Sequence, residues 1–259
     1  MRPRIICHMT SSLDGRLRVD RCLRRDTETE RALVGSTYEQ LAARLGTEGW
    51  MVGRKTMEEF AFGAPRAFAA SSPDPRKPFV GQRKGRKVAV AVDLHGKLHY
   101  GRDDALGDHL IAILGPDVPD EYLAELRHDG VSYLFTPARG EPGHGSPAEE
   151  LRHAMNVLGD GFGIRSLMLQ GGGITNGTFL KAGLIDEISL IVYPGIDGLT
   201  GMPAIFECAG EANERPAAGS VLEHVATETL DSGLVWLRYR IGKADTPAAW
   251  LPSDGSAPR

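Results

Sequence analysis

Three consecutive glycines, Gly171, Gly172 and Gly173, separate a strand-like run LMLQ (167–170) from a helix-like run ITNGTFLKAG (174–183). Glycine loses the most conformational freedom on folding, so three in a row weaken both neighbouring elements. In an open α/β sheet, ligands bind where strands lead into helices, and missing Cβ atoms let phosphate groups approach the N–H groups of a helix start. The turn therefore indicates a phosphate-binding site, with a purely structural tight turn as the alternative.

The helix after this turn would add side-chain donors from Thr175, Asn176 and Thr178. The spacing differs from that of a P-loop, because GxxxxGK[ST] is absent. It also differs from a dinucleotide-binding G-x-G-x-x-G that is followed by an acidic residue on a second strand.

A second run, VGRKT (52–56), also follows a strand and opens a helix. Arg54 and Lys55 bring positive charge there, and Thr56 brings a hydroxyl group. Charged and hydroxyl donors at a helix start suit a phosphate, so this run predicts a second binding element. A helix start with exposed basic residues is the alternative.

A third run, MTSSLDGRL (9–17), places Ser11, Ser12 and Asp14 just past the first expected strand, with Asp14-Gly15 forming a turn. Asp14 is the one candidate for a catalytic proton donor in this region. Capping of the turn by the Asp14 carboxylate explains the residue equally well.

Elements that could position these residues alternate along the chain in a βαβ pattern. Short apolar runs predict strands over residues 4–9, 49–53, 87–92, 109–114, 131–135, 166–171 and 187–194. Helical patterns lie between them, over residues 28–45, 54–60, 120–129, 148–158 and 175–183. This order predicts an α/β fold, with a mostly parallel central sheet and helices on both faces.

The C-terminal part changes character. Two strand-like runs, 220–230 and 234–241, are separated by Asp231-Ser232-Gly233, which predicts a C-terminal antiparallel hairpin. A proline-rich loop, 61–79, is long enough to be a functional lid or a disordered insert. No break divides the chain, so we expect one domain over residues 1–242 and a mobile tail over 243–259.

The composition excludes several classes of protein. The 259 residues are 41% hydrophobic and 25% charged, which is typical of a soluble globular protein. The formal net charge of −4 argues against a nucleic-acid partner. No apolar run approaches the ~20 residues of a membrane span, and the N-terminal apolar stretch is too short for a signal peptide. The three cysteines lack metal-ligand spacing. We therefore expect a cytoplasmic protein with neither a metal nor a membrane partner.

Taken together, MTSSLDG, MVGRKT and LMLQGGGITNGTFLKAGLIDEISLIVYPGIDG resemble the dihydrofolate-reductase-like superfamily. More closely, the chain is similar from about residue 2 to 242 to the C-terminal reductase domain of bifunctional riboflavin-biosynthesis deaminase/reductases. The resemblance implies a single dihydrofolate-reductase-like domain, NADPH as the cofactor, a small heterocyclic substrate and a homodimer.

The resemblance also implies roles for individual residues. The residues that it assigns to the cofactor are Thr10, Ser11, Gly53, Arg54, Thr56, Gly171, Gly172, Gly173, Ile174, Thr175, Asn176, Gly177 and Thr178. Ser12 and Gln170 would bind substrate, and Gln170 stands where the family reductases usually carry Glu. Asp14 matches the Asp of SLDG, near the cleft between substrate and nicotinamide.

The chain departs from this family in its substrate-binding region. The family motif D-D-P-x-L-x-x-R is replaced by MEEFAFGAPRAF (57–68), where Arg66, together with Arg76, could supply a phosphate clamp. The zinc deaminase signature is absent from the sequence, which predicts a stand-alone reductase. Three functions stay open: an NADPH-dependent reductase of a pyrimidine or pterin-like metabolite, a promiscuous reductase of small carbonyl or imine compounds, and a non-catalytic nucleotide-binding module.

Overall fold

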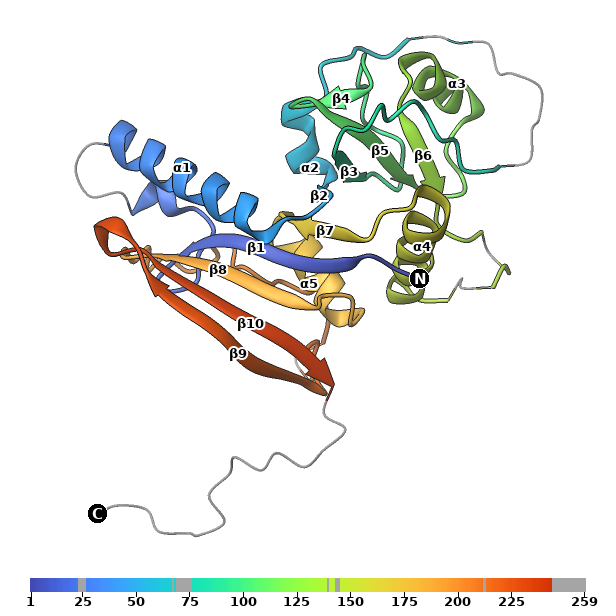
Figure 1. Cartoon of the computed structure of the whole chain (residues 1–259). Helices are drawn as coiled ribbons and strands as arrows, with labels where there is room; N and C mark the ends of the chain where they lie inside the picture. Colours follow the sequence, from blue (N-terminus) through green and yellow to red (C-terminus); the bar gives the residue numbers. More distant parts are fainter. Residues whose placement is uncertain are drawn as a thin grey trace, which may run out of the picture.

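The apolar runs of the sequence pair into one sheet. The computed structural model describes residues 1–22, 27–66, 68, 76–138, 140–142, 145–211 and 213–243. Within these residues, ten strands form a single sheet with helices packed against it (Figure 1). Most of the predicted tail, 244–259, and residues 67 and 69–75 of the predicted long loop lie outside the described residues.

The strands are β1 (Arg4–Ser12), β2 (Gly49–Gly53), β3 (Val88–Val92), β4 (Asp104–Ala105), β5 (Asp108–Leu114), β6 (Ser132–Phe135), β7 (Ser166–Leu169), β8 (Glu187–Tyr193), β9 (Ser220–Thr229) and β10 (Val235–Lys243). The helices are α1 (Thr27–Leu45), α2 (Arg54–Met57), α3 (Asp120–Asp129), α4 (Pro147–Phe162) and α5 (Gly173–Lys181).

The strands lie in the order β4-β5-β3-β2-β7-β1-β8-β10-β9, and β6 also pairs with β5. All pairs among β6, β5, β3, β2, β7, β1 and β8 are parallel. β10 is antiparallel to β8 and forms a hairpin with β9 at the edge of the sheet. The mostly parallel sheet and the antiparallel hairpin predicted from the sequence are therefore confirmed.

Helices cover both faces of the sheet because successive side chains of a buried strand point in opposite directions. In β3, Val88 and Val90 join the core under α4 and α5, whereas Ala89 and Ala91 join the core under α1, α2 and α3. A strand that is apolar at every position is what such two-sided burial requires.

Two boundaries differ from the sequence prediction in ways that affect the site. β1 continues to Ser12, so Ser11 and Ser12 lie inside the strand instead of past its end. The parallel pairing of Thr10, Ser11 and Ser12 with β8 extends the strand beyond its apolar part. Helix α5 begins at Gly173, so the third glycine is already its first residue.

Candidate functional site

The three motifs found in the sequence meet at one edge of the sheet. β2, β7 and β1 are adjacent and parallel, so the runs that follow them leave the sheet at the same carboxyl edge. The helices that follow β2 and β7 then pack on opposite faces, since Met57 of α2 and Phe179 of α5 belong to different cores. Ligands of open α/β sheets bind at such a point, where neighbouring strands lead into helices on opposite faces of the sheet.

Packing explains two of the three consecutive glycines. A Cβ atom at Gly171 would lie 2.7 Å from the Cβ of Thr175, and one at Gly173 would overlap the carbonyl oxygen of Ala204. A Cβ atom at Gly172 would meet nothing within 4 Å. Gly171 and Gly173 thus support the structural-turn alternative, whereas Gly172 leaves the backbone open on the outer side of the turn.

The two glycine motifs touch each other. Gly53 ends β2, and a Cβ atom there would overlap the Oγ1 atom of Thr175 in the first turn of α5. The start of α5 therefore packs directly against the end of β2. The two predicted cofactor elements form one continuous surface, although more than a hundred residues separate them in the sequence.

Helix α5 presents its first-turn N–H groups at this surface. It has nine residues, Gly172 is its N-cap, and no side chain caps it. The side chains of Asn176 and Thr178 have internal partners, because Asn176 donates to the carbonyl of Ile205 at 2.9 Å and Thr178 to that of Ile174 at 2.7 Å. A ligand at α5 would thus be bound mainly by backbone N–H groups, which carry the positive end of the helix dipole.

The basic residues at the start of α2 lie beside this surface. Arg54 forms an ion pair with Glu58 one turn later, and Lys55 is exposed. Thr56 is half-buried and faces a cavity on the α1 side of the sheet. The sequence predicted that these three residues share one phosphate site. In the structure, Thr56 lines the cavity and Arg54 does not.

The predicted nicotinamide contacts of β1 divide between the two faces of the sheet. Strand alternation places Thr10 and Ser12 on the face of His8, which packs against α1, and Ser11 on the opposite face. The Oγ1 atom of Thr10 is buried and has no hydrogen-bond partner among the described residues. A buried hydroxyl without a partner is costly, which makes Thr10 a natural contact for a bound ligand.

Asp14 organises a turn. Its carboxylate accepts hydrogen bonds from the Ser12 hydroxyl at 2.6 Å and from the backbone N–H groups of Asp197 and Gly198 at 3.1 and 2.9 Å. The Ser12 hydrogen bond, followed by those from the backbone, lowers the pKa of Asp14 to about 2. The group is therefore ionised at neutral pH, and these contacts favour the turn-capping alternative over proton donation.

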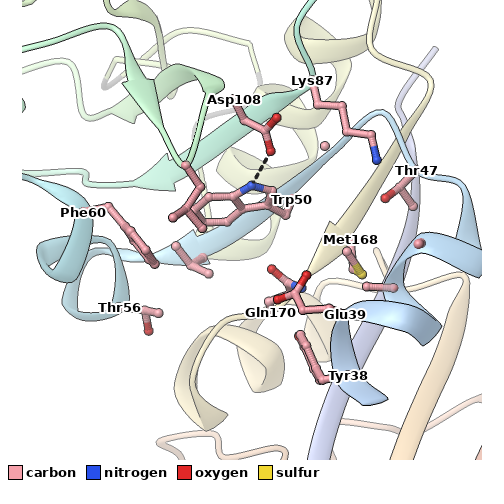
Figure 2. Close-up of a pocket in the computed structure, with 15 residues that line it drawn as sticks. Tyr38, Glu39, Thr47, Trp50, Thr56, Phe60, Lys87, Asp108, Met168 and Gln170 are labelled. Atoms are coloured by element: carbon pink, nitrogen blue, oxygen red, sulfur yellow. Dashed lines mark hydrogen bonds between the residues drawn. The ribbon is translucent and has the colours of Figure 1, made fainter. Parts of the chain in front are cut away.

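A cavity of about 460 Å³ lies on the α1 face of the sheet and extends from this edge to the amino ends of β2 and β3 (Figure 2). Trp50, Val52 and Met168 of the sheet are among the residues that line it. Helix α1 contributes Tyr38 and Glu39, and Phe60 follows α2. The volume is within the range of small-molecule sites, and the lining is mainly apolar with a few polar groups, as is usual for such sites. The other polar residues that line the cavity are Gln170, Thr47, Thr56, Lys87 and Asp108.

Tyr38 is held in the cavity wall by a buried network. Its hydroxyl donates to the carbonyl of His8 at 3.0 Å, and its ring lies 4.3 Å from the His8 ring. His8 in turn bonds the Ser189 hydroxyl at 2.9 Å, which accepts from Trp236 at 2.8 Å. Burial lowers the pKa of His8 to about 4, so the imidazole is neutral at physiological pH. Gln170, a predicted substrate residue, lines the same cavity as Tyr38.

The arginines considered as a phosphate clamp are engaged elsewhere. Arg66 forms ion pairs with Glu125 and Asp129 of α3, and Arg76 forms one with Asp120 of the same helix. These two arginines hold the polypeptide around the predicted loop against α3. The predicted clamp is therefore not formed by Arg66 and Arg76.

The sequence reasoning missed most of the cavity wall. Tyr38 and Glu39 belonged to a recognised helical pattern and Trp50 to a recognised strand, but nothing in those patterns pointed to a site. The combination of a tryptophan in a strand with glycine on both sides of the element, GWMVG, was the one local signal available.

A protein-family model named RibD C-terminal domain matches residues 3–236. The chain belongs to the RibD C-terminal domain family. Comparison with curated proteins finds no match. The family assignment confirms the resemblance drawn from the three sequence motifs, and it covers nearly all of the described sheet.

Solved structures share the fold of this RibD C-terminal domain. A pyrimidine reductase-like protein from Corynebacterium diphtheriae has a TM-score of 0.58 at 15% identity, covering 93% of this chain and 92% of its own. RibD from Acinetobacter baumannii has a TM-score of 0.57 at 16% identity, covering 93% of this chain, which spans 58% of that protein. The Saccharomyces cerevisiae riboflavin biosynthesis reductase Rib7 has a TM-score of 0.53 at 13% identity, covering 93% and 90%. The predicted α/β fold, with its mostly parallel sheet and C-terminal hairpin, is shared with these structures.

Two searches of the described residues returned nothing. None of their helices is both long and apolar enough to cross a membrane. No three or more of their His, Cys, Asp and Glu side chains are grouped so that they could hold a metal ion.

Proposed function

We propose that this chain is an NADPH-dependent reductase of a pyrimidine or pterin-like metabolite, similar to the 5-amino-6-(5-phosphoribosylamino)uracil reductase of riboflavin biosynthesis. Membership of the RibD C-terminal domain family supports the reaction class. The observation that carries the cofactor is the open backbone of Gly172 at the uncapped start of α5, where the fold itself needs no glycine.

The residues at the carboxyl edge fit a dinucleotide. The N–H groups of the first turn of α5 would bind the pyrophosphate. On the β3 side of this turn, a smaller cavity of about 160 Å³ is lined by apolar groups of Val92, Leu94 and Ile174 and would accept the adenine. On the other side, the unpartnered Thr10 hydroxyl would lie near the nicotinamide. Arg54 would contact the phosphate of the adenosine half.

The bound cofactor would supply a hydride, and the chain supplies position. The side-chain amide of Gln170 lines the cavity, where its carbonyl oxygen and N–H groups would bind the heteroatoms of a flat ring. Asp14 fixes the turn after β1 as an ionised group, so we assign the proton for the substrate nitrogen to solvent. Trp50 and Phe60, whose rings lie 5.5 Å apart, provide an apolar wall that limits the access of water.

Titration with NADPH and NADH, followed by fluorescence, tests the cofactor. Gly172→Val should weaken NADPH binding by at least about tenfold, because a branched side chain would block phosphate approach without disturbing the fold. Gly161→Val, which adds the same side chain on an exposed part of α4, should leave binding unchanged. Absence of binding by either nucleotide would overturn the proposal.

Two further measurements separate the alternatives. Substrate-dependent oxidation of NADPH distinguishes a reductase from a non-catalytic nucleotide-binding module. Rescue of a riboflavin-reductase-deficient bacterium distinguishes the pyrimidine reductase from a promiscuous reductase of small carbonyl or imine compounds.

We also propose a cytoplasmic homodimer, as expected from the resemblance. The edge strand β9 supports the dimer, because no strand of the described residues pairs with its outer side and Val221, Leu222 and Val225 are exposed on it. Sedimentation of the purified chain should give twice the monomer mass, and a concentration-independent monomer would contradict the proposal.

A further inference from the structure

The cavity of Figure 2 has a second polar end, opposite Gln170. Lys87 and Thr47 lie at this end, and the ammonium group of Lys87 points towards Thr47. Lys87 immediately precedes β3, and strand alternation places its side chain on the same face as Ala89 and Trp50. Both polar ends therefore open into one cavity over the floor formed by Trp50.

Strand register gives the separation of the two ends. Trp50 is paired with Met168 on one side and with Ala89 on the other. Gln170 lies two residues beyond the level of Trp50 and Lys87 lies two residues before it, so four residues separate them along the strands. Four residues of parallel strand correspond to about 13 Å. A ligand that touched both ends would be elongated.

Lys87 is the lining cation of this cavity that has no anionic partner among the described residues. The acidic neighbour, Asp108, accepts the indole N–H of Trp50 at 2.9 Å. Thr47 is buried, and its hydroxyl likewise forms no hydrogen bond within that part of the chain. The other basic groups considered for substrate binding, Arg66 and Arg76, are neutralised by carboxylates of α3.

We propose that Lys87 and Thr47 bind the anionic tail of the substrate, in place of a clamp formed by Arg66 and Arg76. The substrate class is then a flat ring held near Gln170, joined through a chain of several atoms to a phosphate or carboxylate group. A lysine ammonium and a hydroxyl supply the donors that such an anion needs. This inference rests on the proposed function, because it assigns the far end of the same substrate cavity.

Calorimetric titration with anionic probes tests the site directly, without turnover. Ribose 5-phosphate and p-aminobenzoylglutamate carry the two kinds of anion, and ribose is the neutral control. The probe with the matching tail should bind the wild-type chain, and Lys87→Ala should raise its Kd at least about tenfold, as expected for loss of a charge-assisted hydrogen bond. Thr47→Val should raise it a few-fold, and Lys97→Ala, at an exposed lysine outside the cavity, should not change it.

The outcomes separate this inference from the cofactor proposal. Binding of ribose 5-phosphate alone identifies a phosphate tail, and binding of p-aminobenzoylglutamate alone identifies a carboxylate tail; either supports the inference if Lys87→Ala weakens it. The inference would be overturned if the wild-type chain and Lys87→Ala bound the anionic probes equally well, or if the wild-type chain bound neither probe. NADPH titration of the same samples reports on the cofactor site separately, since Lys87 lies at the opposite edge of the sheet.

Discussion

The carboxyl edge around α5 and the cavity beneath α1 differ in the groups that they offer to a ligand. The edge is built from backbone: Gly172 is open, the first N–H groups of α5 are uncapped, and Asn176 is turned inward to Ile205. The cavity is built from side chains, with Trp50 as its floor and Lys87 at its far end. Backbone N–H groups suit a phosphate common to many ligands, whereas side chains can change with the substrate. We therefore propose that the edge binds the cofactor phosphates and that the cavity binds the substrate.

The largest expected effect distinguishes a glycine required for packing, Gly177, from Gly172, which we propose is required for ligand binding. Gly177→Val should lower the free energy of unfolding by about 3 kcal/mol or more, because its Cβ would overlap the carbonyl oxygen of Glu207. Gly172→Val should change it by less than about 0.5 kcal/mol, since nothing lies within 4 Å. Urea denaturation of both variants measures the difference. Equal destabilisation would show that the turn has no open side.

The next effect concerns the network behind the cavity. The pKa of His8 is lowered from 6.5 to about 4 by burial, so the unfolded chain takes up its proton first as the pH falls. Stability is unaffected by His8 above about pH 6.5 and should decrease by about 3 kcal/mol as the pH falls to 4. Urea denaturation across this range, compared with His8→Gln, isolates the contribution. A wild-type chain and variant with parallel pH profiles would contradict the assignment of a neutral, buried His8.

The smallest effect concerns the 2′-phosphate that distinguishes the proposed cofactor, NADPH, from NADH. Arg54→Ala should reduce the ratio of NADPH to NADH affinity a few-fold, because an exposed charge contributes modestly. Glu58→Gln should raise that ratio slightly, since it removes the carboxylate that competes for Arg54. Binding titrations of both nucleotides measure the two ratios. If neither substitution moves the ratio, Arg54 does not contact the phosphate.

Much of the fold could be predicted from local pattern. The runs at 49–53 and 120–129 match β2 and α3 at both ends. A strand buried on both faces is uniformly apolar, and a helix is bounded by residues that favour its start and its end. Gly130, with φ 77°, ends α3 in the left-handed conformation that glycine tolerates best. In the same way, Ser232 and Gly233 take positive φ values in the turn of the terminal hairpin.

Parts of the site could not be predicted, because their geometry depends on partners far away in the chain. Ser12 reads as a loop residue, yet pairing with Tyr193 of β8 draws it into β1. From the sequence, Arg66 is a candidate ligand contact, but it forms ion pairs with Glu125 and Asp129. From the sequence, Asp14 is a candidate acid, but hydrogen bonds from the Ser12 hydroxyl and from two N–H groups of the chain after β8 lower its pKa.

The sequence by itself determined the order of strands and helices, the three motifs at the carboxyl edge and the family, because these follow from periodicity and from turns that few residues can form. Tertiary structure alone decided which glycine is open, which cations are free and which side chains share a cavity. Those properties depend on strand register and on the face that each helix covers, which bring Tyr38, Trp50, Lys87 and Gln170 together from four separate segments.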